Sequence, residues 1–372
     1  MGLRVRPLES VGVISDHPAH GFWSGKRVLI TGHTGFKGAW LVKLLSGLGA
    51  QISGVSLPPH TTPSLFTEGG FESIMQAHHV ANVCDRDGLC KIFDNVQPEI
   101  VFHLAAQALV TVSYDDPATT FSSNVMGTVN LLEACRLQES VNTIVMITTD
   151  KVYRNNEWCW PYREGDRLGG HDPYSASKAA SELVIDSYRD AFLAPNQVAL
   201  GVARAGNVIG GGDWSANRLI PDAIRAWELQ QPLTIRRPDA IRPWQHVLDP
   251  LFNYLLLAQK LWSGAVPREA YNFGPAVEGS LTVRNVIQLA REAWGDEVSV
   301  EYGDTSDGYH EAGILKLDNS KARDLLGVRS VWDAQQAIKR TVGWYRGFRD
   351  GVAVHELCDR DIAAYLKTAS DG

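Results

Sequence analysis

The sequence has few cysteines, and their spacing matches no common motif. There are five, an odd number, and none form a Cys-x-x-Cys pair. This argues against a disulfide framework and against a zinc site. Free thiols are typical of reducing compartments, so the sequence predicts a cytoplasmic protein. The cysteines are Cys84, Cys90, Cys135, Cys159 and Cys358.

Long apolar segments are also missing. No run approaches the length of about 18 residues that a membrane helix needs. Charged residues interrupt the first 20 positions, which therefore lack the apolar core of a signal peptide. We interpret residues 1–22 as a loosely held N-terminal extension and expect no membrane partner.

An excess of basic residues is absent as well. The formal net charge is −7 and the sequence pI is about 5.9. This balance argues against nucleic acid as a partner, and an anionic small substrate would need local Arg or Lys side chains. The pairs at 78–79 (His-His) and 310–311 (His-Glu) lack metal-site spacing, so no metal is expected.

Short β-rich segments alternate with helical segments through the first half of the chain. Strands are predicted at 26–31, 51–55, 100–106, 143–149 and 198–203, and helices at 39–48, 125–137 and 247–262. Such alternation is typical of a parallel sheet covered by helices on both faces. The sequence therefore predicts an α/β fold with a Rossmann-type doubly wound parallel sheet.

A glycine-rich segment follows the first predicted strand and opens a helix. It reads Gly32-His33-Thr34-Gly35-Phe36-Lys37-Gly38. Glycines permit a tight turn and a close approach of the backbone to a pyrophosphate at the helix N-terminus. The Gly-x-x-Gly-x-x-Gly spacing is the form found in short-chain and extended dehydrogenase/reductases, so a bound dinucleotide is predicted.

The glycine segment suggests a division of the chain. Residues 23–205 are predicted to form the dinucleotide-binding domain. Beyond residue 206 the pattern loosens into segments rich in Gly, Pro, Trp and Arg. We expect residues 206–350 to form mainly a smaller substrate-binding domain, with some segments returning to the sheet, and residues 351–372 to form a tail.

One part of the dinucleotide fingerprint is missing. An acidic residue about 20 positions after the glycines holds the adenosine ribose of NAD. Here the second predicted strand leads to Ser56, with no Asp or Glu. Either Ser56 holds the ribose weakly, or a 2′-phosphate is tolerated. His33 and Lys37 are expected to bring bulk and positive charge to the phosphate turn, unless Lys37 is simply solvated.

Tyr174 and Lys178 lie one helical turn apart. A free tyrosine ionises near pH 10, too high for a base at neutral pH. A lysine ammonium on the same helix face favours the phenolate and is expected to lower the pKa of Tyr174. Together with the glycine segment, the pair predicts removal of a proton from a sugar or alcohol hydroxyl. The alternative is an ordinary exposed Tyr and Lys.

Thr149, Asp150 and Lys151 follow the strand predicted at 143–149. Strand ends of a parallel sheet face the ligand crevice, so a hydroxyl, a carboxylate and an ammonium there could serve one reaction. The alternative is a turn in which Asp150 is a cap. Asn124 precedes a predicted helix, and the alternative to a functional role is that it only caps the N-terminus of that helix.

Several arginines are candidates for binding an anion. Arg242 is favoured because an Arg fork matches a phosphate bidentately. Arg218 and the pair at 236–237 are further candidates, with solvated side chains as the alternative.

The chain resembles the extended short-chain dehydrogenase/reductases that modify nucleotide sugars, and among them the CDP-glucose 4,6-dehydratases. The resemblance extends from about residue 23 to beyond residue 344. Its motifs are Thr31-Gly-His-Thr-Gly-Phe-Lys-Gly38, His103-Leu-Ala-Ala-Gln107, Asn124-Val-Met-Gly-Thr128, Thr149-Asp-Lys151, Glu157-Trp-x-Trp160, Tyr162-Arg-Glu164, Gly170-x-Asp-Pro-Tyr-Ser175, Arg204-Ala-Gly-Asn-Val-Ile-Gly-Gly-Gly-Asp-Trp214 and Ile241-Arg-Pro-Trp-Gln-His246.

The resemblance implies an internal redox dehydration of a nucleotide-diphospho-sugar, with NAD regenerated in each turnover. Tyr174, supported by Lys178, takes the 4-hydroxyl proton, and Thr149 holds the resulting ketone. Lys151 removes the C5 proton and Asp150 protonates the departing 6-hydroxyl. Asn207, Arg218 and Arg242 are the expected substrate contacts.

The resemblance also implies the cofactor contacts, which come from the strand ends and the glycine segment. They are Gly32, His33, Gly35, Phe36, Lys37, Gly38, Ser56, Asn82, Val83, Leu104, Ala105, Ala106, Asn124, Tyr174 and Lys178. Two departures concern Thr111, where Arg is expected, and Asn82, where relatives place an Asp near the adenine. The amide oxygen of Asn82 could still accept from the adenine amine. A homodimer or homotetramer is expected.

Two alternatives remain at this point. A nucleotide-sugar 4-epimerase uses the same Tyr, Lys and NAD but needs no acid at C6, so Asp150-Lys151 disfavours it. Related dTDP-glucose dehydratases carry Asp-Glu at these two positions. A non-catalytic dinucleotide-sensing protein is disfavoured by the intact Tyr174 and Lys178.

Overall fold

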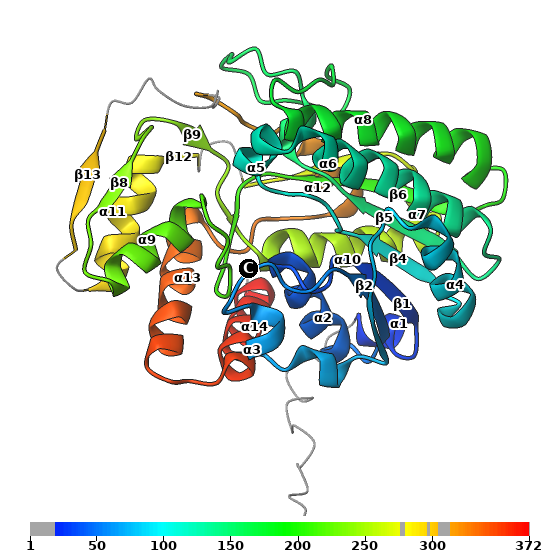
Figure 1. Cartoon of the computed structure of the whole chain (residues 1–372), viewed down its shortest axis with the longest axis horizontal. Coiled ribbons are helices and arrows are strands. Elements are labelled where there is room, and N and C mark those ends of the chain that lie inside the picture. Colours follow the sequence, from blue (N-terminus) through cyan, green and yellow to red (C-terminus); the bar gives the residue numbers. More distant parts are fainter. Residues whose placement is uncertain (1–18, 276–279, 296–297, 304–312, 372) are drawn as a thin grey trace, which may run out of the picture.

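The computed structural model describes residues 19–275, 280–295, 298–303 and 313–371. Its centre is a seven-stranded sheet with the strand order β11-β6-β5-β4-β1-β2-β3, and all pairings within it are parallel (Figure 1). The strands are β1 (Arg27–Thr31), β2 (Gln51–Ser56), β3 (Ala77–Val80), β4 (Ile100–His103), β5 (Thr143–Ile147), β6 (Ala199–Ala205) and β11 (Ala270–Phe273). The predicted Rossmann-type doubly wound fold is confirmed.

Helices cover both faces of the sheet because successive strand residues point to opposite sides. On β1, Val28 and Ile30 join one core cluster and Leu29 joins the other. The first cluster includes side chains of α2 (Phe36–Gly47) and α10 (Leu248–Trp262). The second includes α4 (Arg86–Val96), α7 (Gly127–Arg136) and α8 (Pro173–Tyr188). The chain order reverses between β1 and β4, so a ligand crevice is expected at their carboxyl ends.

The region after β6 builds three two-stranded sheets beside the main one, two of which are labelled at the left of Figure 1 by β8 with β13 and β9 with β12. They pair β7 (Val208–Ile209) with β10 (Gln245–His246), β8 (Leu233–Ile235) with β13 (Val300–Tyr302), and β9 (Ile241–Arg242) with β12 (Leu281–Thr282). The accompanying helices are α9 (Leu219–Glu228), α11 (Val283–Trp294), α12 (Ser320–Leu326) and α13 (Ala334–Arg349). β11 returns from this region to the edge of the main sheet.

The end of the chain packs against its beginning. The segment from 351 contains α14 (Val354–Asp371), which buries Leu357, Ile362 and Tyr365. Lys43 of α2 forms an ion pair of 2.9 Å with Asp359 of α14. The proposed boundary at residue 22 falls inside α1 (His20–Trp23), whose Trp23 is fully buried. Residues 1–18 lie outside the described part.

Shorter helical segments complete the fold. They are α3 (Leu65–Glu68), η1 (Phe71–Ile74), α5 (Val110–Asp115), α6 (Pro117–Phe121), η2 (Ser122–Met126), η3 (Asp150–Val152) and η4 (Arg189–Leu193). None of the helices in the described ranges has both the length and the apolar character needed to cross a membrane.

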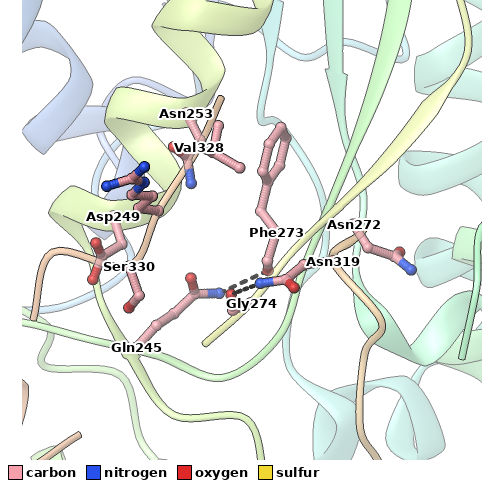
Figure 2. A pocket seen from close by; sticks show the side chains of 10 residues that line it. Gln245, Asp249, Asn253, Asn272, Phe273, Gly274, Asn319, Val328 and Ser330 are labelled. Atoms are coloured by element: carbon pink, nitrogen blue, oxygen red, sulfur yellow. Dashed lines mark hydrogen bonds between the residues drawn. The ribbon is translucent and has the colours of Figure 1, made fainter. Parts of the chain in front are cut away.

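A small polar cavity of about 10 Å³ lies where β11 and β10 meet α10 (Figure 2). Gln245 donates to the Phe273 carbonyl over 3.0 Å and Asn319 donates to the Gly274 carbonyl over 2.7 Å. Asp249 also lines the cavity, and its Oδ2 has no hydrogen-bond partner among the described residues. This is about the smallest space that holds one water molecule, which polar walls of this kind commonly bind.

Element boundaries differ from the sequence prediction in ways that have physical reasons. Helix α2 begins at Phe36 rather than Ala39, because Gly35 takes the extended N-cap conformation. The strands predicted to reach 106 and 149 end at His103 and Ile147. An apolar run indicates which residues are buried, but it does not show where the backbone hydrogen bonds between strands stop. β3 was not predicted, since its polar sequence Ala-His-His-Val lies at the sheet edge and lacks an apolar pattern.

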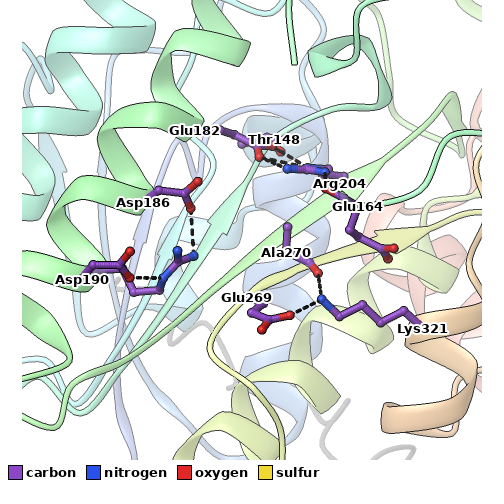
Figure 3. A network of polar contacts seen from close by, with 10 residues as sticks. Thr148, Glu164, Glu182, Asp186, Asp190, Arg204, Glu269, Ala270 and Lys321 are labelled. Atoms are coloured by element: carbon purple, nitrogen blue, oxygen red, sulfur yellow. Dashed lines mark hydrogen bonds and ion pairs between the residues drawn. The ribbon is translucent and has the colours of Figure 1, made fainter. Parts of the chain in front are cut away.

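A buried ion pair joins β6 to α8 (Figure 3). Arg204 Nε lies 2.9 and 3.0 Å from the two carboxylate oxygens of Glu182, and both side chains are almost completely buried. Thr148, just after β5, donates to Glu182 over 2.6 Å, and Arg204 also donates to the Tyr153 hydroxyl over 2.8 Å. The pair thus fixes two strand ends and one helix relative to each other.

Replacing Glu182 by alanine should destabilise the fold strongly, because it leaves the Arg204 guanidinium buried without a counter-ion. We expect a loss of about 3–5 kcal/mol in the free energy of unfolding, measured by urea denaturation. The control is Glu356→Ala, which breaks the exposed Glu356–Arg360 pair and should cost less than about 1 kcal/mol. Equal losses in the two variants would contradict the prediction.

Candidate active site

The glycine turn connects β1 to α2 and leaves no room for side chains at two positions. Gly32 has a φ of 74°, and a Cβ there would lie 2.7 Å from the Ala105 nitrogen. A Cβ on Gly38 would lie 2.2 Å from the Gly32 carbonyl oxygen. Gly35 caps α2 without a side-chain hydrogen bond, so the first N–H groups of the helix have no side-chain acceptor. This geometry suits the binding of a pyrophosphate.

His33 does not carry the positive charge expected of it. Its ring is buried against Gly54 of β2, where a Cβ would come within 2.4 Å of the ring. His33 Nε2 lies 2.6 Å from His78 Nδ1 of β3. Burial, reinforced by His78, lowers the pKa of His33 to about 4, so the imidazole is neutral at pH 7. The expected charge was therefore wrong, and only the backbone of His33 stays in the turn.

Lys37, in contrast, belongs to a group of charged side chains at the strand ends. Burial lowers its pKa to about 8, as do the neighbouring charges of Arg218 and Lys178, whereas Asp150 and Asp213 raise it. The alternative of a simply solvated Lys37 is therefore wrong. Its position among these side chains supplies the local positive charge that an anionic ligand requires in a protein of net charge −7.

Ser56, the residue expected to hold the ribose, forms hydroxyl contacts behind the glycine turn. Ser56 Oγ lies 2.7 Å from Thr34 Oγ1, and the Thr34 hydroxyl donates to the Leu57 carbonyl over 2.9 Å. Asn82 Oδ1 accepts from the Cys84 nitrogen over 2.9 Å, so this oxygen already has a donor besides any adenine amine. Asn130 donates to the Val83 carbonyl over 3.1 Å and so holds this segment, a role that its place inside a helix did not reveal.

The segment Leu104-Ala105-Ala106 leaves β4 beside the glycine turn. The Ala105 nitrogen donates to Thr31 Oγ1 over 3.2 Å, and this hydroxyl lies 2.7 Å from His103 Nδ1. Burial lowers the pKa of His103 to about 3, which keeps it neutral. The segment is thereby fixed along the carboxyl edge of β1 and β4, where a dinucleotide would cross the sheet.

Asn124 connects this segment to α8 and does not serve as a helix cap. It lies within η2, is 1% exposed, and its Oδ1 accepts from the Gln107 nitrogen over 2.8 Å. Its Nδ2 donates to Ser177 Oγ over 2.8 Å. Ser177 stands between Tyr174 and Lys178, so Asn124 sets the distance between the β4 loop and the helix that carries the predicted base.

Tyr174 and Lys178 are positioned by the first turns of α8. Asp172 caps the helix by accepting from the Ser175 nitrogen over 2.9 Å, and Pro173 occupies the first turn. Lys178 Nζ donates to the Ile147 carbonyl at the end of β5 over 3.2 Å. Burial lowers the pKa of Lys178 to about 8, against the opposing effect of Glu182.

The predicted lowering of the Tyr174 pKa was wrong for the protein alone. Burial raises the pKa of Tyr174 to about 12, and the hydrogen bond with Thr149 only partly offsets this. The sequence argument considered the neighbouring ammonium but not the cost of burying a phenolate. Tyr174 is nevertheless buried and not an ordinary exposed tyrosine.

Asp150 lies near Tyr174, and one of its carboxylate oxygens has no hydrogen-bond partner among the described residues. Thr149, rather than Asp150, caps η3: its Oγ1 accepts from the Lys151 nitrogen over 3.3 Å and donates to Asp150 Oδ1 over 3.0 Å. Asp150 is 2% exposed, and its Oδ2 has no hydrogen-bond partner in the described part of the chain. Burial raises the pKa of this carboxyl, opposed by the charges of Lys151 and Arg242. The cap alternative is therefore wrong.

The carboxyl of Asp150 is approached from the second region by Gly206, a residue not predicted from the sequence. A Cβ on Gly206 would lie 3.1 Å from Asp150 Oδ2 and 2.5 Å from Pro243. The next residue, Asn207, accepts from the Gln245 nitrogen through its carbonyl over 3.1 Å. A side chain at 206 would close the space beside the acid.

The anion candidates separate by burial. Arg242 is 3% exposed and donates to the Ile241 carbonyl over 2.9 Å. Arg218 forms a 2.8 Å ion pair with Asp213, whose charge raises the Arg218 pKa. Arg236 and Arg237 are exposed. Lys37 and Arg242 thus lie near Asp150, and Arg218 and Lys178 lie near Lys37, whereas the exposed pair shows no such link to Asp150 or Lys37.

The histidine pair at 78–79 belongs to no candidate metal site among the described residues. His78 contacts His33, and no cluster of three His, Cys, Asp or Glu side chains is present among the residues that the structure describes. The pair at 310–311 lies outside the described residues.

The chain is similar to known nucleotide-sugar dehydratases. The chain matches the model of the family described as GDP-mannose 4,6 dehydratase over residues 29–353. It is 44% identical to the CDP-glucose 4,6-dehydratase of Salmonella typhimurium, over 94% of this chain and 98% of the relative. It is 32% identical to the dTDP-glucose 4,6-dehydratase of Streptomyces antibioticus, over 67% of this chain and 70% of the relative.

Solved structures share the fold. The dTDP-glucose 4,6-dehydratase of Bacillus anthracis in complex with NAD has a TM-score of 0.74 at 20% identity, over 88% of this chain and 98% of that one. The UDP-glucose 4-epimerase of Thermus thermophilus in complex with NAD has a TM-score of 0.72 at 26% identity, over 86% of this chain and 99% of that one. Given a family model matched over most of its length and relatives that cover it almost end to end, the chain belongs to the GDP-mannose 4,6-dehydratase family of extended short-chain dehydrogenase/reductases.

Proposed function

We propose that the protein is an NAD-dependent CDP-glucose 4,6-dehydratase, a hydro-lyase of deoxysugar biosynthesis that forms CDP-4-keto-6-deoxyglucose. The observation that carries the proposal is Asp150, a buried carboxyl with a raised pKa and an unbonded oxygen, which contacts Thr149 and lies close enough to Tyr174 to influence its pKa. A 4-epimerase needs no acid at C6, so this carboxyl argues against that alternative. The 44% identity to a CDP-glucose 4,6-dehydratase supports the choice of substrate.

The residues fit a dinucleotide. The glycine turn excludes side chains where a pyrophosphate would approach, and the N-terminus of α2 lacks a side-chain cap. We propose that Gly32, Gly35, Phe36 and Gly38 hold the pyrophosphate and that Ser56 holds the ribose. Asn82 and Val83 would contact the adenine, and Leu104, Ala105, Ala106 and Asn124 would line the sheet edge. When bound there, NAD would supply a reversible hydride acceptor for C4 oxidation and C6 reduction.

The side chains then divide the proton transfers. Tyr174 takes the proton of the 4-hydroxyl, Lys178 stabilises its phenolate, and Thr149 donates to the developing C4 carbonyl. The ketone acidifies the neighbouring carbon, so Lys151 can remove the C5 proton. Asp150 gives its proton to the departing 6-hydroxyl, which leaves as water, and C5 regains a proton when C6 is reduced. Asn207, Arg218 and Arg242 would hold the substrate and its diphosphate.

Replacing Tyr174 by phenylalanine should lower kcat on CDP-glucose by a factor on the order of 10² to 10⁴, the usual contribution of a general base. The substitution removes only a hydroxyl, so the circular dichroism spectrum and the melting temperature should stay close to wild type. Formation of the 4-keto-6-deoxy product measures the rate. Unchanged turnover would remove Tyr174 from the mechanism.

Replacing Asp150 by asparagine should separate oxidation from elimination. An amide cannot protonate the leaving hydroxyl, so C4 oxidation should proceed while loss of water slows. Rapid mixing with CDP-glucose should then show a transient rise in NADH absorbance that the wild type lacks. If oxidation and elimination both keep their wild-type rates, the acid lies elsewhere.

In the wild type, activity should fall as pH rises through the raised pKa of Asp150, because the carboxyl must be protonated to act.

The missing ribose carboxylate should weaken NAD binding. Charge-assisted bonds to the ribose contribute roughly 1.5–3 kcal/mol each, and Ser56 replaces at most one neutral bond. We expect a loss of about 1–3 kcal/mol, or about 5- to 150-fold in affinity relative to enzymes with the acid. The protein should purify partly loaded and gain activity when NAD is added. Full occupancy after long dialysis would show that other contacts hold the adenosine.

Two further properties remain predictions. All five cysteines are free, which suits a cytoplasmic protein. A homodimer or homotetramer would cover apolar side chains such as Phe121, Met126 and Leu183, which are exposed on α6, η2 and α8, elements that pack on one another. Sedimentation equilibrium would give the number of subunits.

A further inference from the structure

The turn at Glu157–Trp160 has no role in the chemistry described above, yet it has an unusual backbone. Glu157 has a φ of 51°, in the left-handed region that glycine and asparagine favour. A glutamate there is strained and persists only where surrounding contacts compensate. The contacts of the Glu157 side chain and backbone therefore account for this conformation.

Contacts on both sides fix the turn. The Glu157 nitrogen donates to Asn155 Oδ1 over 2.8 Å, and Asn155 Nδ2 donates to the Ile314 carbonyl over 2.9 Å. The Asn156 nitrogen donates to the hydroxyl of the buried Tyr162 over 2.7 Å. The conformation of Glu157 is therefore imposed by its neighbours and directs its carboxylate toward the segment that begins at Gly313.

Gly313 joins this turn to Arg242. Its N–H donates to Glu157 Oε1 over 3.0 Å. Its carbonyl accepts from the Ile241 nitrogen over 3.0 Å and from Arg242 Nη1 over 3.3 Å. Gly313 therefore contacts the Glu157 carboxylate through its N–H and the Arg242 guanidinium through its carbonyl. A shift of Gly313 moves one of the acceptors of Arg242, another being the Ile241 carbonyl.

The turn is also connected to the catalytic segment. Trp158 stacks on Tyr162 at 5.4 Å between ring centroids, and Tyr162 stacks on Tyr153 at 5.1 Å. Tyr153 follows η3, which carries Asp150, and its hydroxyl donates to Asn272 over 2.6 Å. The turn thus lies between two anchored points, the catalytic strand end and the segment that contacts Arg242.

We propose that Glu157 is a positioning residue for the diphosphate of the nucleotide sugar, acting through Gly313 on Arg242. This rests on the proposed function, in which Arg242 binds that diphosphate. Glu157 touches no reacting atom, so it should govern affinity for the substrate and leave the proton transfers unchanged.

The test compares three variants at this position with the wild type. Glu157→Ala and Glu157→Gly remove the acceptor, and Glu157→Gly also relieves the strain. Both should raise KM for CDP-glucose by roughly 3- to 10-fold, the worth of one hydrogen bond, with kcat unchanged. Glu157→Gln keeps an oxygen acceptor and should stay within about twofold of wild-type KM. Asn155→Ala, which loses the bond to Ile314, should raise KM as Glu157→Ala does.

Gln230→Gly is the matched control, because Gln230 also has a left-handed φ, of 53°, but contacts none of these residues through its side chain. It should leave KM and kcat at wild-type values. Calorimetric binding of CDP to the wild type and the variants gives a readout that needs no turnover. The Kd for CDP should rise in Glu157→Ala by the same factor as KM.

The outcomes separate the two proposals. If the wild type does not convert CDP-glucose but binds CDP, the proposed function fails, and the Kd values alone decide the role of Glu157. Wild-type Kd in Glu157→Ala, a fall in kcat at unchanged KM, or a Glu157→Gln variant as weak as Glu157→Ala would each overturn the positioning role. Failure of the wild type to bind CDP would overturn both.

Discussion

The ion pair between Arg204 and Glu182 is the constraint on which the geometry of the site depends. Glu182 lies on the same helix as Tyr174 and Lys178, and it also accepts from Thr148, the residue before Thr149. Arg204 extends the link to Tyr153 and to the Glu164 carbonyl. Both charges are buried and satisfied only by each other and their hydrogen-bond partners. A relative shift of β5, β6 or α8 would therefore leave a buried charge without a counter-ion. The base and the acid are therefore held at a fixed separation.

Charge in the site runs against charge in the whole protein. The chain carries seven more negative than positive charges, yet Lys37 and Arg242 lie near the buried carboxyl of Asp150, and Arg218 and Lys178 lie near Lys37. Burial lowers the pKa values of Lys37 and Lys178 and so disfavours the charged forms of these two side chains. Two bound diphosphate groups, one from the cofactor and one from the substrate, would supply negative charge that stabilises the protonated lysines. Binding and protonation are thus linked.

Features that depend on backbone spacing could be predicted from the sequence. The glycine turn, the alternation of strands and helices, and the helical spacing of Tyr174 and Lys178 follow local rules, and the structure agrees with each of them. The position of Thr149-Asp150-Lys151 at a strand end was predictable for the same reason.

Features that depend on residues distant in sequence could not be predicted. His33 is neutral because Gly54 and His78 surround it, and these come from β2 and β3. The raised pKa of Tyr174 follows from burial, which no spacing reveals. Asn124 resembles a cap in sequence but bonds to Gln107 and Ser177, which the fold brings to it.

The contact between α2 and α14 has a consequence for synthesis of the chain. The helix that would receive the cofactor is among the first to leave the ribosome, but Lys43 pairs with Asp359, near the C-terminus, and Trp40 donates to the Gly211 carbonyl over 2.9 Å. The last strand of the sheet, β11, also arrives late. Although domains often fold from the N-terminus during translation, Lys43 lacks its partner until residues 316 positions later have been synthesised. The packing of the helix that would receive the cofactor is thus completed only when α14 docks.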